Sequence, residues 1–434
     1  MKSLKYTLAL LFMCSPLAMN AQWLRIWNAG ESTRVAVSEA TNLPYSAAGS
    51  SITIAGTTYS TAEIDSITIV NPVKITWNGS TATYDMPESV EGVNIEVNGG
   101  DVVINNTNIT SEQEFILAGT STAGSLTYNG TFKTKFHLAG LNLTSTSGAA
   151  LDIQCGKRID LILEDGTTNS LADAVGGTQK AALNCQGHLE IAGGGSLTIA
   201  GKAAHALRSN EYLFLKKSVG QITITEAAGD AIHCGEYFLM NGGTVTISSA
   251  DKDGLQVETD DNSDELLNGQ LIINGGSLTV NVSNEDVKGI RLDAAETNTS
   301  ITPEMSILGG EVTVNVTATA KGSKGIASDG NITIGDGADN DPVVTVNVAG
   351  GVFVDEEEED QRAVGMKATK TLTIAGGKTE IYATGTQSRG VRAYTLIATA
   401  GSLTIRNTGS GSQGLKLDKA PTISGGVVDA ILVK

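Results

Sequence analysis

Aromatic and charged side chains are scarce in this chain of 434 residues. Phe, Trp and Tyr together make up 4% of it and charged residues 18%, whereas glycine occupies 51 positions. This composition disfavours a core of bulky side chains and favours tight, regular stacking of backbone. Basic residues are few as well, with 29 against 47 acidic ones and a net charge of −18. Nucleic-acid binding needs a basic surface, so we expect no nucleic-acid partner.

Long hydrophobic runs are missing from the chain after its first residues. Near the N-terminus, Lys2 and Lys5 precede a short apolar run, and small residues follow it up to Ala21. This pattern predicts a secretory signal peptide over residues 1–21, because its apolar part is too short for a stable membrane span. We therefore expect an exported protein without a membrane span, placed outside the cell, at its surface or in the periplasm.

Cysteine is rare, and beyond the signal peptide only Cys155, Cys185 and Cys234 remain. An odd number of cysteines in an exported protein leaves at least one thiol unpaired. We expect all three to be buried free thiols on one inward row of a repeating structure, with a disulfide between Cys155 and Cys185 as the alternative.

Repetition is what the sequence has in abundance. A small residue, an apolar residue, a variable residue and a second apolar or small residue recur in this order nine times. The first apolar residues of the nine copies are Leu183, Leu207, Ile232, Leu255, Ile290, Ile326, Met366, Val391 and Leu415. The steps between them are 24, 25, 23, 35, 36, 40, 25 and 24 residues, which is typical of a repeat architecture with three insertions.

Each repeat alternates with period two and is rich in Thr, Val and Ile, which predicts strands, while Gly-Gly pairs supply the corners. Stacked coils of this kind bury an apolar side that one coil cannot bury alone. We therefore predict an all-β fold, a right-handed parallel β-helix over residues 73–434. Residues 22–72 are expected to form a small N-terminal β-rich module or cap. We expect a monomer.

The variable residue of each repeat should point outward, and its row is unusually rich in hydrogen-bond donors. The row reads Asn184, Arg208, His233, Gln256, Arg291, Ala327, Lys367, Arg392 and Lys416. The small residues, from Ala182 to Gly414, are expected beside it as a flat outer floor. A flat surface of small residues next to a row of hydrogen-bond donors predicts an extended binding site for a polysaccharide chain. The alternative is an ordinary solvated surface. The predicted ligand-binding residues are Arg208, His233, Gln256, Arg291, Lys367 and Arg392.

Carboxylates gather beside this row. Asp230 and Asp253 fall on consecutive coils, and Glu258, Asp260 and Asp261 follow in a loop. Clustered carboxylates repel one another unless a cation lies between them, and hard oxygen ligands suit Ca²⁺. The sequence therefore predicts calcium as a cofactor here, with a solvated acidic loop as the alternative.

A second candidate calcium site lies in the sequence GDGADND. It would use Asp336, Asp339 and Asp341, although their spacing matches neither the EF-hand nor the glycine-rich calcium repeat.

Three segments carry a family resemblance: VKITWNGSTATY (73–84), LEDGTTNSLAD (163–173) and KDGLQV (252–257). With them the chain resembles the carbohydrate-binding parallel β-helix proteins of cellulolytic and gut anaerobes. The resemblance covers about residues 73–434. It implies a pectate-lyase-like fold, binding of plant cell-wall polysaccharide including acidic sugars, bound calcium, and no established cleavage.

Three functions remain open at this stage. The first is an exported, non-catalytic polysaccharide-binding protein that uses calcium for acidic or plant cell-wall glycans, and no catalytic residue is assigned. The second is a calcium-dependent uronan lyase, in which Arg208, Arg291 or Lys288 would act near Asp230 and Asp253. The third is a structural surface adhesin. The scarcity of Trp and Tyr disfavours a stacked aromatic platform for cellulose.

Overall fold

The computed structural model describes residues 23–28, 31–37, 39–40, 43–44, 46, 48–337, 341–354 and 360–432. The predicted signal peptide lies outside these ranges. Within them the regular structure consists of β-strands, and no helix there is long and apolar enough to cross a membrane. Contacts divide the chain into two compact units. Of the described residues, one unit holds those from 23 to 75, 84–92 and 113–116, and the other holds 76–83, 93–112 and those from 117 to 432.

The first unit begins with a small antiparallel sheet in the order β2-β1-β5 and a separate β3–β4 hairpin. Its strands are β1 (Trp23–Asn28), β2 (Glu31–Ala36), β3 (Ser51–Ile54), β4 (Thr57–Ser60) and β5 (Ile64–Val70). Alternating apolar residues give it a core of its own, made of Leu24, Ile26, Val35, Val37, Ala40, Ile52, Ile54 and Tyr59.

The large parallel structure starts with strands of uneven length, among which β8 and β9 form an antiparallel pair. These are β6 (Val73–Asn78), β7 (Thr81–Asp85), β8 (Val93–Asn98), β9 (Gly100–Asn106), β10 (Gln113–Ser121), β11 (Gly124–Gly130) and β12 (Thr134–Thr144). From β13 to β30, each strand pairs in parallel with the strand three positions later, so three strands make one coil. Three parallel sheets result, which we call the first, second and third sheets.

The first sheet contains β13 (Leu151–Gln154), β16 (Ala181–Cys185), β19 (His205–Ser209), β22 (Ile232–Cys234), β25 (Leu255–Val257), β28 (Lys288–Leu292), β31 (Lys324–Ser328) and β38 (Gln413–Leu417). The second contains β14 (Ile159–Leu163), β17 (Leu189–Ala192), β20 (Leu213–Leu215), β23 (Tyr237–Met240), β26 (Gln270–Ile273), β29 (Glu304–Ile307), β32 (Asn331–Ile334) and β39 (Thr422–Ile423). The third contains β15 (Thr168–Ala172), β18 (Ser196–Gly201), β21 (Gln221–Ala227), β24 (Thr244–Ile247), β27 (Ser277–Val282), β30 (Glu311–Val316), β33 (Val343–Val348) and β40 (Val427–Leu432). Two long strands, β36 (Val364–Ala383) and β37 (Arg389–Asn407), run through all three sheets.

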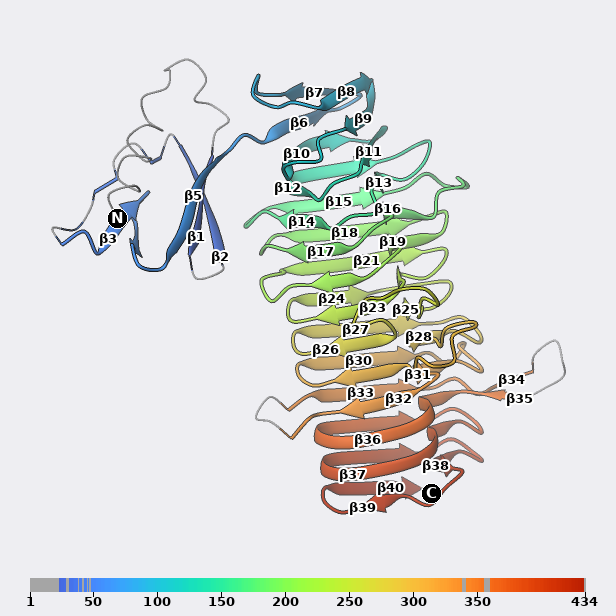
Figure 1. The fold of residues 1–434 in the computed structure, drawn as a ribbon. Helices are drawn as coiled ribbons and strands as arrows, with labels where there is room; N and C mark the ends of the chain where they lie inside the picture. The colour runs from blue at the N-terminus through green and yellow to red at the C-terminus, as the bar shows by residue number, and fades with distance from the viewer. Residues whose placement is uncertain are drawn as a thin grey trace. The chain divides into compact units, whose positions relative to one another are not determined.

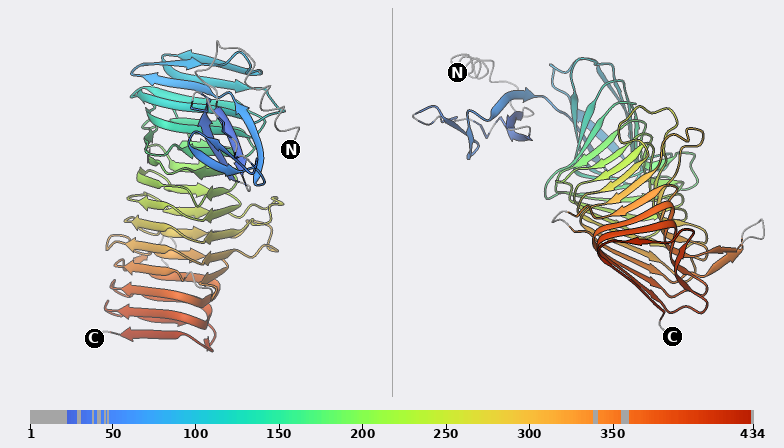
Figure 2. Two further views of the ribbon diagram at one scale, coloured as in Figure 1. Left: turned by 90° about the vertical axis from the view of Figure 1, so that its left-hand side faces the viewer. Right: turned by 60° about the horizontal axis from the view of Figure 1, so that its bottom comes forward.

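This architecture is the predicted right-handed parallel β-helix, and its coils stack from β13 to β40 in Figures 1 and 2. The first apolar residues of the repeats pair with one another along the first sheet, from Leu183 with Leu207 to Val391 with Leu415. All of them except Leu415 in the last coil are buried. The predicted inward row is confirmed, and it forms the first sheet's part of the core of the β-helix.

The three long repeats carry their extra residues at corners and leave the sheets in register. Residues 258–269 lie between β25 and β26, and residues 293–303 lie between β28 and β29. The third long repeat includes the hairpin of β34 (Val352–Val354) and β35 (Asp360–Arg362). The first two insertions follow strands of the first sheet, so both emerge at the corner between the first and second sheets.

The cysteines are buried and free, as predicted. Cys185, Ser209 and Cys234 occupy one inward row, but Cys155 does not share it, because Ile153 is the residue that pairs with Cys185. The predicted place of Cys155 is therefore wrong by two residues. Burial raises the pKa of the Cys185 thiol to about 12, which keeps it protonated and unreactive.

Candidate functional site

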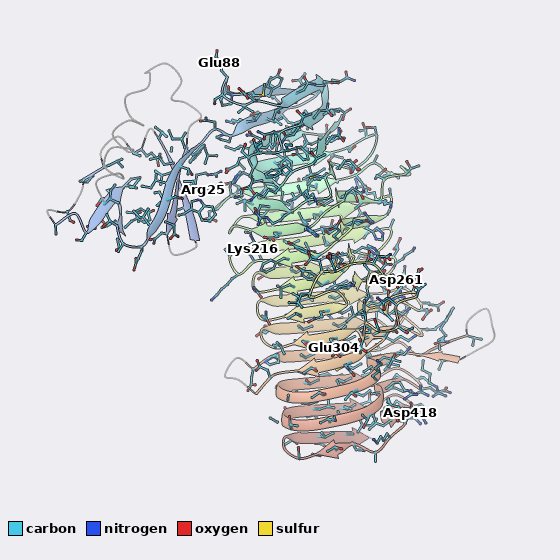
Figure 3. The ribbon with its side chains drawn as sticks, in the orientation of Figure 1. Arg25, Glu88, Lys216, Asp261, Glu304 and Asp418 are labelled. Carbon is cyan, nitrogen blue, oxygen red and sulfur yellow. The ribbon has the colours of Figure 1, made fainter. Side chains whose placement is uncertain are left out.

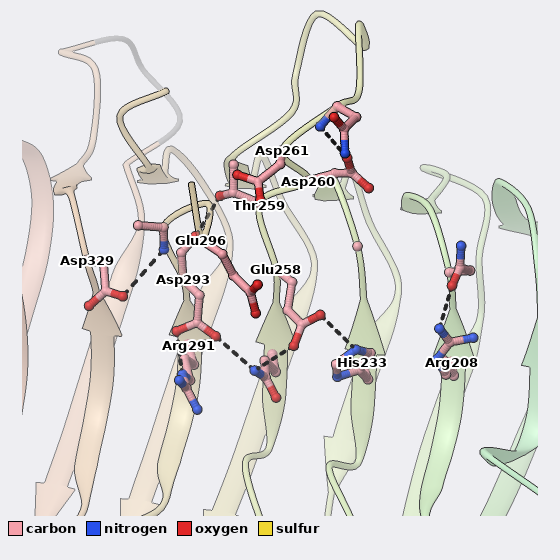
Figure 4. A pocket seen from close by; sticks show the side chains of 15 residues that line it. Arg208, His233, Glu258, Thr259, Asp260, Asp261, Arg291, Asp293, Glu296 and Asp329 are labelled. Atoms are coloured by element: carbon pink, nitrogen blue, oxygen red, sulfur yellow. Dashed lines mark hydrogen bonds and ion pairs between the residues drawn. The ribbon is translucent and has the colours of Figure 1, made fainter. Parts of the chain in front are cut away.

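The outward row predicted from the sequence exists as a continuous ladder on the first sheet. Its members pair in register from Asn184 to Lys416, one residue per coil. We call this row the polar ladder. Its middle part faces a hollow of about 530 Å³ whose lining includes Arg208, His233, Gln256 and Arg291 (Figure 4).

The other two predicted ligand-binding residues lie outside this hollow. Lys367 lines a neighbouring hollow of about 290 Å³, together with Lys288 and Lys324. Arg392 donates to Asp418 at 2.8 Å. The structure thus brings four of the six predicted ligand-binding residues to one place.

The predicted outer floor of small residues is wrong. Ala182, Ala206 and Ala231 are fully buried, and the glycines at this position in later coils face the core. A Cβ on Gly325 would lie 2.4 Å from Cγ1 of Val346, a core residue. Strict alternation fails here because the pairing between neighbouring strands is interrupted at this position. Lys288 pairs with Lys324 and Ile290 pairs with Ile326, whereas the glycines between them do not pair.

The entrance to the first sheet holds a compact hydrogen-bonded group. Oδ2 of Asp230 lies 3.1 Å from Nδ1 of His233 and 3.2 Å from Nδ1 of His205, and the two imidazole rings stack 4.5 Å apart. On its other side, Nε2 of His233 lies 3.5 Å from Oε2 of Glu258. His233 therefore joins a buried carboxylate to an exposed one at the edge of the hollow.

These contacts shift the protonation of both partners toward the charged form. Burial alone would lower the pKa of His233, but its hydrogen bonds to Asp230 and Glu258 raise it from 6.5 to about 9. Burial would likewise raise the pKa of Asp230, yet the hydrogen bonds with His205 and His233 hold it well below its usual range. At neutral pH the group is an ion pair of imidazolium and carboxylate.

A second charged group lies on the next two coils of the ladder. Nη1 of Arg291 donates to Oδ2 of Asp253 at 3.0 Å, and its Nε donates to Oδ1 of Asp293 at 2.5 Å. Gln256 donates to Oδ2 of Asp293 at 2.8 Å. Burial would lower the pKa of Arg291, but these two carboxylates raise it, so the guanidinium is fixed and charged.

Arg208 differs from Arg291 in its partners. Its guanidinium donates to the side-chain oxygens of Asn184 at 3.3 Å and Asn210 at 2.5 Å. Among the residues that the structure describes, no carboxylate forms an ion pair with it, and burial lowers its pKa. Arg208 is thus a cation at the hollow whose charge is not neutralised by a paired side chain.

The carboxylates of Asp230 and Asp253 are bound by protein donors on both oxygens. Oδ1 of Asp230 accepts from the backbone N–H of Asp253 at 2.9 Å, and Oδ1 of Asp253 accepts from that of Lys288 at 2.7 Å. Each aspartate thus accepts a hydrogen bond from the backbone at the start of the first-sheet strand in the next coil. The repulsion from which the sequence predicted calcium at this pair is relieved by these donors, and calcium binding there stays a prediction.

The insertion loop 258–269 places the other predicted acidic ligands over the hollow. Glu258, Asp260 and Asp261 all line it, and Asp261 is labelled in Figures 3 and 4. Oδ1 of Asp261 accepts from the backbone N–H groups of Asn298 at 2.7 Å and Thr297 at 2.9 Å, and these bonds lower its pKa. The two insertion loops are therefore tied together above the ladder.

The second predicted calcium site lies elsewhere. Asp336 and Asp341 are exposed at the corner between the second and third sheets, and Oδ1 of Asp341 accepts from the backbone N–H of Gly377 at 2.9 Å. Asp339 lies outside the described residues. The structure does not bring this corner to the polar ladder, and calcium binding there also stays a prediction.

Comparison with known proteins identifies the family. The family model described as "Carbohydrate-binding domain-containing protein" matches residues 104–431. The chain belongs to this carbohydrate-binding family. The match includes the whole polar ladder and both insertion loops.

A solved structure also resembles this carbohydrate-binding protein. It is a polysaccharide lyase-like protein from C. thermocellum, solved as a gadolinium derivative, with 22% sequence identity and a TM-score of 0.48. The likeness covers 61% of this chain and 98% of the other. No curated protein matches the chain.

Sequence reasoning missed three residues that shape the site of this carbohydrate-binding protein. His205, Asp293 and Glu296 were not singled out, although Asp293 and Glu296 line the hollow. His205 could have been found from the sequence, because the position two residues before the first apolar residue of each repeat is often charged. That column reads Ala181, His205, Asp230, Asp253, Lys288 and Lys324. In this column basic residues lie next to acidic ones on neighbouring coils. Stacking therefore brings opposite charges together and neutralises them where they are buried.

The stability of the protein should fall as the pH rises from about 6.5 to about 9. The folded state raises the pKa of His233, so its stabilising contribution is complete below 6.5 and is lost as pH rises through about 9. The loss should amount to roughly 3 kcal/mol at most. Urea unfolding at a series of pH values measures it.

The variant Asp230→Asn is the control for this pH dependence. It removes the stronger partner of His233, so the fall in unfolding free energy over the same pH range should shrink to less than half. An equal fall in the variant and the parent would assign the effect to other groups.

Proposed function

We propose that this protein is exported and binds polysaccharide without cleaving it, and that the glycan lies in the hollow over the polar ladder. The observation that carries the proposal is the hollow itself. On the fold of a carbohydrate-binding family, it places Arg208 and Gln256 beside exposed carboxylates. Among its described lining residues none is Trp, Tyr or Phe, so recognition would rest on hydrogen bonds and charge.

The charge of the hollow favours an acidic glycan that binds together with a cation. Six carboxyl groups line it, against two guanidinium groups and one imidazole. The carboxyl groups belong to Glu258, Asp260, Asp261, Asp293, Glu296 and Asp329. A bare uronate would meet mostly like charge, and a divalent ion between the two sets of carboxylates would turn that repulsion into attraction. Plant cell-wall polysaccharides rich in uronic acid are the ligand class we propose.

Calcium suits the exposed carboxylates of the loop. Its preferred ligands are carboxylate and carbonyl oxygens in flexible surroundings, and Glu258, Asp260 and Asp261 supply three carboxylates on one insertion. Asp230 and Asp253 suit it less, because their oxygens already accept hydrogen bonds from the protein. When bound, calcium would supply positive charge that attracts the uronate. Arg208 and Gln256 would donate hydrogen bonds to the oxygens of the same uronate.

One observation favours a second candidate function, uronan β-elimination. A lyase needs a base beside the substrate, and burial lowers the pKa of Arg208 at the edge of the hollow. Both terminal nitrogens of Arg208 nevertheless donate to asparagine oxygens, as those of a protonated guanidinium do. The non-catalytic function is therefore preferred.

A retention assay tests the proposal. The mature protein is mixed with polygalacturonate, pectin, xylan and cellulose, with calcium or with EDTA, and absorbance at 235 nm reports unsaturated product. We expect retention on the acidic glycans with calcium, loss of retention in EDTA, and constant absorbance. A rise in absorbance would indicate a lyase, and no retention on any glycan would leave a structural adhesin.

A double variant locates the binding site. Glu258→Gln combined with Asp260→Asn removes two exposed carboxylates and should weaken calcium-dependent retention by about tenfold, or about 1.4 kcal/mol. Glu311→Gln is the matched control, because Glu311 is exposed on the third sheet. Equal retention by the double variant, the control and the parent would place the glycan elsewhere.

A further inference from the structure

A second group of titratable side chains lies at the corner between the first and second sheets. His188, Glu211 and Glu236 come shortly before β17, β20 and β23, so they stack on three consecutive coils. Glu265 reaches the group from the insertion loop 258–269. None of the four lines the hollow described above.

The ligand atoms of this group converge on one imidazole nitrogen. Nε2 of His188 contacts Oε2 of Glu211, and it lies 3.8 Å from Oε2 of Glu236 and 4.0 Å from Oε1 of Glu265. The ligand atoms of His188, Glu211 and Glu236 all lie within 4.8 Å of one another. Zinc–ligand bonds of about 2.1 Å place tetrahedral ligands about 3.4 Å apart. Small side-chain movements would therefore give such a shell.

Glu236 supplies independent evidence that this group binds a cation. The residue is 6% exposed, and its buried Oε2 has no hydrogen-bond partner, while Oε1 accepts from Ser263 at 2.5 Å. A buried carboxylate oxygen without a donor is costly. A cation in front of it would remove that cost.

The imidazole is held in place and can be reached from solvent. The ring of His188 stacks on Tyr212 at 4.4 Å, and Tyr212 stacks on Tyr237 at 4.5 Å. The side chains of His188 and Glu211 are 22% and 29% exposed. A rigid, partly exposed imidazole beside carboxylates can take up an ion without rearrangement of the coils.

We propose that His188, Glu211 and Glu236, together with Glu265 from the insertion loop, bind one first-row transition-metal dication of the zinc type. The imidazole decides the class of ion, because nitrogen ligands favour zinc and its neighbours, whereas calcium takes oxygen ligands. This site is separate from the glycan hollow and does not depend on the proposed function.

Calorimetry with zinc chloride tests the site directly. The full chain, stripped of metal with a chelator, is titrated with Zn²⁺. The variants Glu211→Gln and Glu236→Gln are each expected to lose one equivalent of bound zinc or to bind it at least tenfold more weakly. Glu226→Gln, at an exposed position of the third sheet, should bind zinc like the parent. Equal binding by all four proteins would overturn the proposal.

Melting temperatures separate a metal ligand from a structural residue. With chelator, Glu236→Gln should melt no lower than the parent, because the variant removes one of three neighbouring carboxylates. With saturating zinc the parent should gain more than the variant, because an ion that binds the folded state stabilises it by mass action. A variant that loses the same stability with and without zinc would contradict the assignment.

Discussion

Replacing Asp230 with alanine is expected to lower the free energy of unfolding by about 3–5 kcal/mol, as removal of one partner of a buried ion pair does. Asp230 is 3% exposed, and its carboxylate accepts from His233 and from the backbone of Asp253. Without it, a partly buried imidazolium loses its nearest counter-charge and the next coil loses an acceptor. Urea unfolding at pH 7, followed by far-ultraviolet circular dichroism, measures the change.

Asp251→Ala is the matched control for this prediction. Asp251 lies in the next coil of the β-helix, but its side chain is exposed and accepts a hydrogen bond from Asn284 at 3.5 Å. We expect its substitution to change the unfolding free energy by less than about 0.5 kcal/mol. Similar losses in the two variants would mean that Asp230 contributes no more than a surface carboxylate.

Replacing Gly325 with alanine is expected to lower the free energy of unfolding by about 1–3 kcal/mol, the range for overpacking a core. The added methyl group would lie 2.4 Å from Cγ1 of Val346 and 2.7 Å from the carbonyl oxygen of Gly365. The backbone atom belongs to the next coil and cannot move without disturbing the first sheet. The same urea titration reports the loss.

Gly156→Ala provides the same substitution where there is room for it. A Cβ at Gly156 would meet no atom within 4 Å, and the position needs no positive φ. Here alanine should stabilise the protein by about 0.4–1 kcal/mol, because it restricts the unfolded chain. If Gly325→Ala were as well tolerated, the small residues would face outward after all.

The period of the sequence was enough to predict the coils and their main rows. Each step of about two dozen residues returns the chain to the same sheet, so Leu183 and Leu207 had to align once the repeat was recognised. The polar ladder followed from alternation within a strand. Alternation breaks where the pairing of β28 with β31 skips one residue, and for that reason the direction of Gly325 was predicted wrongly.

The buried charges could not be predicted from single repeats. Asp230 reads as a surface residue until the coils on either side are placed against it, because its partners His205 and Asp253 lie 25 and 23 residues away. The acidic group around Glu236 escaped for the same reason. Its four members are single polar residues in four successive repeats, and only stacking brings them together.

The insertions at the corner between the first and second sheets lengthen the loops without disturbing the fold. The step between repeats grows from 23 residues to 35 and 36, yet β22, β25, β28 and β31 remain paired in register. A longer loop adds little to the entropy of closure once its ends are fixed. Such a corner can hold loops of different length and sequence on an unchanged scaffold, so the proposed glycan site can vary without any change in the core.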